Sequence, residues 1–366
     1  MSTLPDECVD LVVTSPPYPM IQLWDDQFSE IAPAIKTALE KENAPLAFEQ
    51  MHQQLDMAWI QMLRVLKPGA MACINIGDAT RSMGGQFQLF ANHARVISKF
   101  LSLGFMQLPS ILWRKPTNAP NKFMGSGMLP PGAYVTLEHE FILIFRKGGK
   151  RTFPEKIEKQ ARRESAYFWE ERNRWFSDVW MDLRGAPQSV NQNRSRVRSG
   201  AFPLELPFRL INMFSVIGDT VLDPFLGTGT TVLAAMCCGR DSLGFEIDPA
   251  FQHTILEKMA TVPETANAVI RQRLIAHQEF VQERIEANEK PKHHNRHYNV
   301  PVVTRQEEDL WLNPVQHVHY SSAQKARVIY GGKSRTTELP ALSPPDHGSG
   351  KPPFLPPAKG RQLKLF

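Results

Sequence analysis

The sequence of 366 residues contains only four cysteines, and none of them belongs to a Cys-x-x-Cys pair. Zinc sites usually use that spacing, so the composition does not favour one. Cys237 and Cys238 are adjacent in an apolar run of helical character, while Cys8 and Cys73 stand alone. We therefore expect buried free thiols and assign no metal ligand.

Long hydrophobic runs are also lacking. No stretch approaches the roughly 20 apolar residues of a membrane-spanning helix. The first residues do not show the basic, apolar and small-residue order of a secretory signal. Hydrophobic residues make up 42% of the chain and charged residues 22%, a balance typical of globular proteins. We expect a cytoplasmic protein with no membrane partner.

A glycine-rich turn lacks the residues that define two common nucleotide sites. Residues 223–231 have the sequence DPFLGTGTT. A P-loop would need a lysine that is absent here, and a dinucleotide fingerprint would need glycine or alanine where Val232 stands. What remains is a strand ending in an acid, a narrow turn at Gly227 and Gly229, and a helix that Thr228 or Thr230 can cap.

An acidic residue follows this turn at a distance typical of nucleoside sites. Glu246 lies 23 residues after Asp223, at the end of the next predicted strand. An acid about 20 residues beyond such a turn binds ribose hydroxyls in nucleotide sites. A carboxylate at Asp223 suits an ammonium group better than a phosphate. The pattern points to an amino-acid-bearing nucleoside such as S-adenosylmethionine, and the alternative is a turn that only connects strand to helix.

A second motif, TSPPY, occupies residues 14–18 directly after an apolar run. The exocyclic amine of a base is a poor nucleophile because its lone pair is delocalised, so a site that uses it must accept its hydrogens. The Ser15 hydroxyl and the Pro16 carbonyl are such acceptors, and Pro16 and Pro17 fix the backbone. Tyr18 can stack on a base that has left its duplex. The alternative is a proline-rich turn without a catalytic role.

The hydrophobic pattern alternates strands with helices. The strand between residues 220 and 223 and the next one flank a helix that Gly239 can close in a left-handed cap. That crossover implies parallel strands in a doubly wound α/β sheet. Pro68 and Gly69 should end the helix before them. The expected strands are Val9–Thr14, Met71–Ile76, Phe141–Phe145, Thr220–Asp223 and Leu243–Glu246, and the expected helices are Met51–Leu66, Thr231–Cys238 and Phe251–Asn288.

Positive charge is concentrated in one segment. The whole chain carries +5, whereas residues 146–198 hold fourteen Lys and Arg against seven acids, or +7. Such a mixture of cations and aromatics suits phosphate contacts and stacking on bases. A solvated helix with an aromatic core stripe is the alternative. The interleaved aromatics are Tyr167, Phe168, Trp169, Trp175, Phe176 and Trp180.

These motifs together resemble the beta class of bacterial DNA amino-methyltransferases, in which the catalytic motif precedes the cofactor motif. The resemblance covers about residues 4–249 and includes ILWRKP at 111–116, EHEFIL at 138–143 and FPLELP at 202–207. It implies an α/β fold with a seven-stranded Rossmann-like methyltransferase sheet, a circularly permuted motif order and a target-recognition insertion.

The resemblance also divides the chain and assigns its site residues. It implies S-adenosylmethionine as cofactor and Ser15, Pro16, Pro17 and Tyr18 as the catalytic turn. The implied cofactor-binding residues are Asp223, Pro224, Phe225, Gly227, Thr228, Gly229, Glu246 and Phe202. The expected regions are a catalytic half at 1–149, target recognition at 150–200, a cofactor-binding half at 201–260, a helical or mixed extension at 261–338 and a disordered tail at 339–366. Tyr298–Thr304 is a candidate to complete the cofactor pocket, and the loop 117–134 to close over a flipped base.

Within this family, Ser at position 15 usually accompanies methylation of cytosine N4, and Asp usually accompanies adenine N6. We therefore expect N4-cytosine methylation of double-stranded DNA by base flipping, with adenine as the alternative. Carbon-5 methylation would need a nucleophilic cysteine, normally after proline, and no Pro-Cys pair occurs. The expected setting is the DNA of a bacterial or archaeal cytoplasm, with a cognate restriction endonuclease as a partner. A catalytically idle DNA-binding module and a small-molecule methyltransferase are the remaining alternatives.

Overall fold

The computed structural model describes residues 1–115, 124–184, 202–322 and 325–332. The expected tail at 339–366 and residues 117–123 of the expected closing loop lie outside this range. Within the described part, no helix combines the length and the apolar character needed to cross a membrane.

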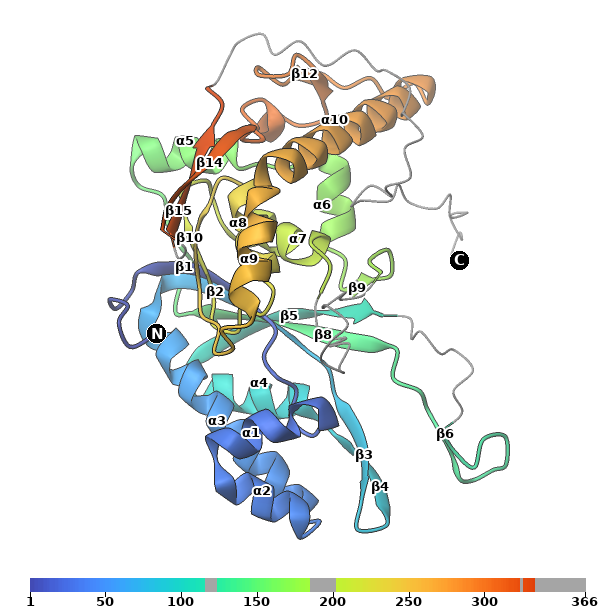
Figure 1. Cartoon of the computed structure of the whole chain (residues 1–366). Helices are drawn as coiled ribbons and strands as arrows, with labels where there is room; N and C mark the ends of the chain where they lie inside the picture. The colour runs from blue at the N-terminus through green and yellow to red at the C-terminus, as the bar shows by residue number, and fades with distance from the viewer. Residues whose placement is uncertain (116–123, 185–201, 323–324, 333–366) are drawn as a thin grey trace.

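A seven-stranded sheet forms the centre of the molecule (Figure 1). Its strand order is β11-β10-β1-β2-β8-β5-β9, and all neighbouring strands are parallel except β8, which is antiparallel to both β2 and β5. The expected seven-stranded α/β sheet is thus confirmed. The strands are β1 (Val9–Thr14), β2 (Leu66–Ile76), β5 (Phe105–Arg114), β8 (His139–Lys147), β9 (Val179–Trp180), β10 (Thr220–Asp223) and β11 (Asp241–Gly244).

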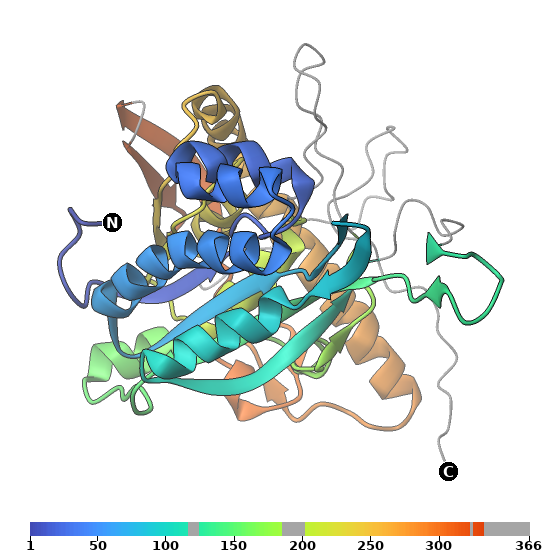
Figure 2. The ribbon, with the colours of Figure 1, turned by 90° about the horizontal axis from the view of Figure 1, so that it is seen from below.

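Helices cover both faces of this sheet because its strands are apolar on both sides. In β1, Val12 enters one hydrophobic core, whereas Leu11 and Val13 enter the other, as the two-residue period of a strand requires. Figure 2 shows the first face, where α3 and α4 lie across the strands. The helices of the first face are α3 (Ala44–Val65) and α4 (Asn92–Ser102), and those of the second are α7 (Glu205–Phe214), α8 (Thr230–Cys237) and α10 (Val262–Glu286).

Smaller elements surround this frame. The other helices are α1 (Asp25–Ile31), α2 (Pro33–Glu40), α5 (Lys156–Glu164), α6 (Trp169–Trp175) and α9 (Phe251–Ala260), with short 3-10 turns at Gln22–Trp24 and Arg305–Glu307. The small sheets are hairpins or pairs formed by β3 (Ala79–Met83) with β4 (Gln86–Phe90), β6 (Met124–Gly125) with β7 (Ala133–Tyr134), β12 (His293–His294) with β13 (Pro301–Val302), and β14 (Val315–Ser322) with β15 (Lys325–Tyr330).

Several expected boundaries were wrong. The helix expected from Met51 begins at Ala44, where the Asn43 side chain accepts a hydrogen bond from a backbone amide of its first turn. Pro68 and Gly69 do not form a turn after it but belong to β2, where the pairing with β1 shifts register. The helix expected over 251–288 is two helices, because α9 ends at Ala260 and α10 begins at Val262, with Pro263 in its first turn.

The strand expected at 243–246 also differs, since β11 is Asp241–Gly244 and ends before Glu246. Its parallel pairing with β10 is as expected. Gly239 adopts the left-handed conformation that was expected after α8, with a φ of 73°. Cys73, Cys237 and Cys238 are buried, also as expected, and Cys8 is partly buried.

The burial of aromatic residues in the basic segment 146–198 shows that the expected stacking on bases was wrong for some of them. Phe168, Trp175 and Trp180 are at most 2% exposed and belong to the hydrophobic cores. They cannot stack on a nucleic acid, so the core-stripe alternative holds for these three. Trp169 and Phe176 are each 38% exposed. The residues of the segment from 185 onwards lie outside the described part of the chain.

Candidate active site

The two sequence motifs meet at one edge of the sheet. β1 and β10 are parallel neighbours, so the turns that follow them leave the sheet at its carboxyl edge, where open α/β sheets bind ligands. Thr14 ends β1, and its Oγ1 donates a hydrogen bond of 2.5 Å to Oδ1 of Asp223 at the end of β10. Residues more than 200 positions apart are thereby joined at the base of a single site.

A cavity of about 880 Å³ opens at this edge. Residues of α1 and α3 form its outer wall, among them Phe28 and Leu55. All four residues assigned to catalysis line it, as do all but one of those assigned to cofactor binding. The assigned residues that line it are Ser15, Pro16, Pro17, Tyr18, Phe202, Asp223, Pro224, Phe225, Gly227, Thr228 and Glu246. The exception is Gly229, which precedes α8 with a φ of 82° and faces Ile255 of α9.

Asp223 holds the glycine-rich turn against β1. It is 2% exposed, and it accepts hydrogen bonds from Thr14, from Thr231 Oγ1 at 2.7 Å and from the Phe225 amide at 3.1 Å. Burial raises the pKa of this carboxyl to about 6, although the two threonine hydroxyls act in the opposite direction. The three donors show that Asp223 fixes the shape of the turn as well as lining the cavity.

Glu246 faces the same turn from the segment that follows β11. Its Oε2 accepts a 2.7 Å hydrogen bond from the Gly227 amide, and its Oε1 accepts one of 2.9 Å from the Asp248 amide. A carboxylate has about four acceptor positions, so two backbone donors orient it and leave acceptor capacity toward the cavity. Gly227 has a φ of 53°, in the left-handed region that glycine adopts without steric cost. This is the geometry expected of a hydroxyl-binding carboxylate.

Lys258 on α9 contacts the same turn from behind. Its ammonium donates to Thr228 Oγ1 at 2.5 Å and to Thr230 Oγ1 at 3.1 Å. The expectation that one of these hydroxyls caps α8 was therefore wrong, since the helix has no side-chain cap. An ammonium can only donate, so both threonine oxygens accept from Lys258. The two hydroxyls lie 3.4 Å apart, and either can donate to the other. Burial lowers the pKa of Lys258 to about 8.

The catalytic turn is held by a hydrogen-bond network that reaches across β2 and β8. The Tyr18 hydroxyl donates to Glu140 Oε2 at 2.9 Å and accepts from Asn75 Nδ2 at 2.9 Å. Asn75 also donates to Glu140 at 2.7 Å, and Lys115 donates to the other carboxylate oxygen at 2.8 Å. Burial and the neighbouring Glu140 charge raise the Tyr18 pKa well above its usual value, so the phenol stays protonated.

This network decides which way the Ser15 hydroxyl points. Ser15 Oγ and the Tyr18 hydroxyl are 3.1 Å apart. Because the single proton of Tyr18 goes to Glu140, Ser15 is the donor in that contact. Its oxygen then keeps acceptor capacity toward the cavity, apart from a long 3.5 Å contact with Asn75. The arrangement can accept a hydrogen from an amine placed in the cavity.

Comparison with known proteins identifies the family. The sequence model described as DNA methylase matches residues 9–257. The chain belongs to this DNA methylase family. It is 50% identical over 313 residues to the type II methyltransferase M.MthZI of Methanothermobacter thermautotrophicus, covering 85% of this chain and 87% of that protein. It is 51% identical over 270 residues to M.MjaI of Methanocaldococcus jannaschii, covering 71% and 88%.

A solved structure agrees with this identification. A protein of Thermus thermophilus, described as a DNA modification methylase and solved with S-adenosyl-L-methionine, is 32% identical. The match has a TM-score of 0.56 and covers 71% of this chain and 89% of that one. The family, its methyltransferase fold and its cofactor, S-adenosylmethionine, are therefore as expected from the sequence.

Sequence reasoning missed four residues whose side chains contact the two turns. Glu140 and Lys115 lie within EHEFIL and ILWRKP, which contributed to the resemblance but received no role. Asn75 is at the end of a predicted strand and could have been noticed as a polar residue in an apolar run. Nothing in the sequence singled out Lys258, which reaches the turn only because α9 packs against α8.

One expectation about the DNA methylase pocket was wrong. Tyr298–Thr304 does not line the described cavity, which residues of α1, α3 and the N-terminal Met1 and Ser2 help to enclose instead. Tyr298 is 4% exposed, stacks on Trp311 and belongs to a third hydrophobic cluster. The sequence could not show this because α1 lies only a few residues after the catalytic turn and carries no motif.

Proposed function

We propose that this chain is a type II DNA methyltransferase that transfers a methyl group from S-adenosylmethionine to the exocyclic N4 of cytosine in duplex DNA. The observation that carries the proposal is the convergence of both motifs on one cavity, with Ser15 placed as a neutral acceptor at its edge. The likeness to M.MthZI over 85% of the chain supports the type II assignment. We further propose that the chain is the modification enzyme of a restriction-modification system. A cognate endonuclease would act at the same DNA site.

The residues around the cavity fit the cofactor. A volume of about 880 Å³ is within the range for sites that enclose a small molecule. Glu246 offers a backbone-oriented carboxylate for the ribose hydroxyls. Phe202 and Phe225 add apolar surface for the adenine ring, and Thr228 a hydroxyl donor for an anionic group. S-adenosylmethionine supplies a methyl group on a sulfonium centre, so no covalent enzyme intermediate is required.

The catalytic turn supplies the chemistry on the base. Ser15 Oγ and the Pro16 carbonyl accept the hydrogens of the amine, which favours a pyramidal nitrogen with an available lone pair. Glu140 and Asn75 act through Tyr18 as positioning residues, because they fix its hydroxyl and thereby the Ser15 rotamer. Orientation and fixed acceptors of this kind are the main contributions a protein makes to such a transfer.

Cytosine is favoured over adenine by the identity of residue 15. Serine usually accompanies N4-cytosine methylation in this family, and aspartate N6-adenine methylation. Ser15 is a neutral acceptor, and the nearest carboxylate in its network, Glu140, already accepts from Tyr18, Asn75 and Lys115. Methylation of adenine N6 is the alternative, and analysis of the methylated nucleosides distinguishes it from methylation of cytosine N4.

A base inside a duplex cannot reach this cavity, so the target must be flipped out. Tyr18 lines the cavity and offers an aromatic surface for the flipped base. Gly77 lies against the edge of its ring, where a Cβ would come within 2.9 Å of Cε2. The ring is thus in contact with Gly77 at its edge and held by hydrogen bonds at its hydroxyl. Within the expected target-recognition region 150–200, α5 lies at the other edge of the sheet. We therefore propose target recognition only for the rest of this segment, between a catalytic half at 1–149 and a cofactor-binding half at 201–260.

The experiment that tests this function is transfer of labelled methyl from S-adenosylmethionine to unmethylated genomic DNA. Ser15→Ala should reduce incorporation at least a hundredfold without loss of cofactor binding. Ser102→Ala, at an exposed serine of α4, is the matched control and should retain full activity. DNA affinity without incorporation in the unmodified protein would instead support a binding module that has lost catalysis.

A further inference from the structure

A second large groove lies at the opposite edge of the sheet from the catalytic cavity. Asp10, near the start of β1, lines this groove, whereas Ser15, directly after β1, lines the cavity. At about 3.3 Å per residue, the strand separates the two sites by roughly 17 Å. Figures 1 and 2 place α5, a wall of the groove, and the β6–β7 hairpin at opposite ends of the sheet. The groove has a volume of about 1140 Å³.

The groove is strongly basic. Nine Lys and Arg line it against four carboxylates. Asp10 is bonded to Lys67, Glu308 and Asp309 pair with Arg296, and Glu307 accepts from the Trp169 amide. Arg151 pairs with Asp219 below the groove. Within the described residues the remaining cations form no ion pair, and they are Arg146, Lys150, Lys159, Arg162, Arg163, Arg172 and Arg305.

Three of these cations lie on one face of α5. Lys159, Arg162 and Arg163 are spaced i, i+3 and i+4, which places them together on a helix surface. All three are exposed and line the groove. The nearby acids of the helix are used internally, since Glu158 accepts from the Glu155 amide and Glu164 from Gln160. Within the described residues, no ion pair joins these three cations to an acid of their own helix.

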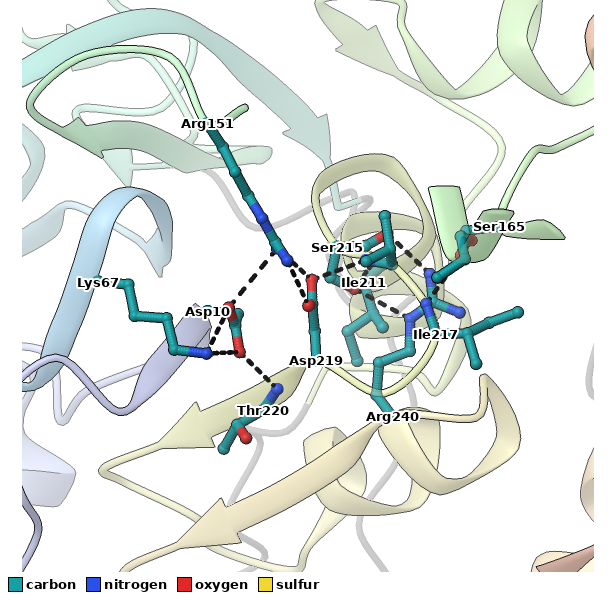
Figure 3. Close-up of polar contacts among 12 residues, drawn as sticks. Asp10, Lys67, Arg151, Ser165, Ile211, Ser215, Ile217, Asp219, Thr220 and Arg240 are labelled. Carbon is teal, nitrogen blue, oxygen red and sulfur yellow. Dashed lines mark hydrogen bonds and ion pairs between the residues drawn. The ribbon is translucent and has the colours of Figure 1, made fainter. Parts of the chain in front are cut away.

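A set of hydrogen bonds and ion pairs beneath the groove holds this wall in place (Figure 3). Arg151 donates to both oxygens of Asp219 at 2.6 and 2.9 Å, and Asp10 accepts two bonds from Lys67 and one from the Thr220 amide. At the C-terminal end of α5, the Ser165 hydroxyl accepts a 2.7 Å bond from the amide of residue 217. The loop before β10 thus ties α5 to the sheet, and the cations stand on a preformed surface.

We propose that this groove is a second, sequence-independent binding site for the phosphate backbone of duplex DNA. Unpaired Arg and Lys on a fixed surface suit phosphate oxygens. The cations come from three separate segments, around residues 146–150, 159–172 and 305, so a polyanion matches them better than a single phosphate. DNA is the polyanion on which this family acts. The inference goes beyond the proposed function, because methyl transfer needs only the cavity at the other edge.

The DNA in the groove is a different segment from the one being methylated. A duplex that presents a base to the cavity runs along the carboxyl edge of the sheet. DNA has a persistence length of about 50 nm, so bending a short flank around the domain to the other edge would be costly. The groove would therefore hold a neighbouring part of a long DNA molecule and let the enzyme pass from one segment to another.

The test uses the full chain with Lys159, Arg162 and Arg163 all changed to Ala. The control carries Ala at Arg271, Lys290 and Lys325, three exposed cations that line neither site. Each protein is first saturated with a short duplex that holds one mapped methylation site and with S-adenosylhomocysteine. A fluorescent duplex without a site is then titrated, and the ionic strength is varied.

Unmodified protein and control should bind the second duplex, and the α5 variant should bind it at least about tenfold more weakly. For this variant, a plot of the logarithm of the binding constant against the logarithm of the salt concentration should be less steep by about three, one for each lost phosphate contact. Methylation of the short duplex should be unchanged. Arg305→Gln, at a groove residue outside α5, should weaken second-duplex binding on its own and checks that the result does not depend on α5 folding. Equal binding by the α5 and control variants, or an equal loss of kcat/KM on the short duplex, would overturn the proposal.

Discussion

Glu140 is the residue on which the geometry of the catalytic turn depends most. It accepts from Tyr18, Asn75 and Lys115, yet it does not line the described cavity. Its contribution is therefore to orient the turn. In the proposed mechanism, the groups that contact the reacting amine differ from those that position them, and the two kinds of residue should respond differently to substitution.

Glu140→Gln keeps the shape of the side chain but removes its charge. Hydrogen bonds to charged groups contribute roughly 1.5–3 kcal/mol, so kcat should fall about 10- to 100-fold. The affinity for S-adenosylmethionine, measured by calorimetry, should not change. Glu138→Gln is the control, since Glu138 pairs at the surface with Arg114. A loss of cofactor affinity as large as the loss of kcat would contradict a positioning role.

Lys258 should make cofactor use depend on pH. Because burial lowers its pKa to about 8, the ammonium loses its proton as the pH rises through that value. The positive charge beside Thr228 and Thr230 is then lost, and kcat/KM for S-adenosylmethionine should decline above pH 8. Lys258→Met should lower kcat/KM about tenfold at pH 7 and abolish this decline. An unchanged profile in the variant, with Lys290→Met as control, would show that another group titrates.

At the scale of elements, α8 depends on its left-handed end at Gly239. A Cβ there would come within 2.8 Å of the buried Asn313 side chain. Gly104 ends α4 in the same conformation, with a φ of 88°, but has open space around it. Gly104→Ala should reduce the free energy of unfolding by about 1 kcal/mol through backbone strain alone. Gly239→Ala should cost about twice as much, and chemical denaturation that gave equal losses would contradict the packing argument.

The elements that local sequence could predict were those with a strong pattern. β1 and β10 were found with their observed limits because each is a short apolar run with a motif directly after it. β5 was not predicted, since its exposed and buried residues alternate irregularly around a bulge. The start of β2 was taken for a turn because Pro68 and Gly69 usually mark one. In the folded chain they form an irregularity in the pairing with β1 instead.

For the molecule as a whole, the sequence located both motifs of the candidate site but not the residues that surround them. Ser15 and Asp223 could be paired only through motif order, and the sheet explains their proximity because β1 and β10 are neighbours. The helices that enclose the cavity carry no motif. The basic segment looked like one DNA-binding region, yet its aromatics Trp175 and Trp180 are core residues and α5 lies at the opposite edge. Long-range packing decides which of these residues are buried and at which edge of the sheet they lie, so the local sequence could not show it.

The measurement that tests the central claim most directly is the identity of the methylated base. Unmethylated genomic DNA would be treated with the protein and S-adenosylmethionine, digested to nucleosides and analysed by mass spectrometry, with Ser15→Ala in parallel. We predict N4-methylcytosine with the unmodified protein and none with the variant. N6-methyladenine as the product, or N4-methylcytosine that persists in Ser15→Ala, would contradict the role given to Ser15.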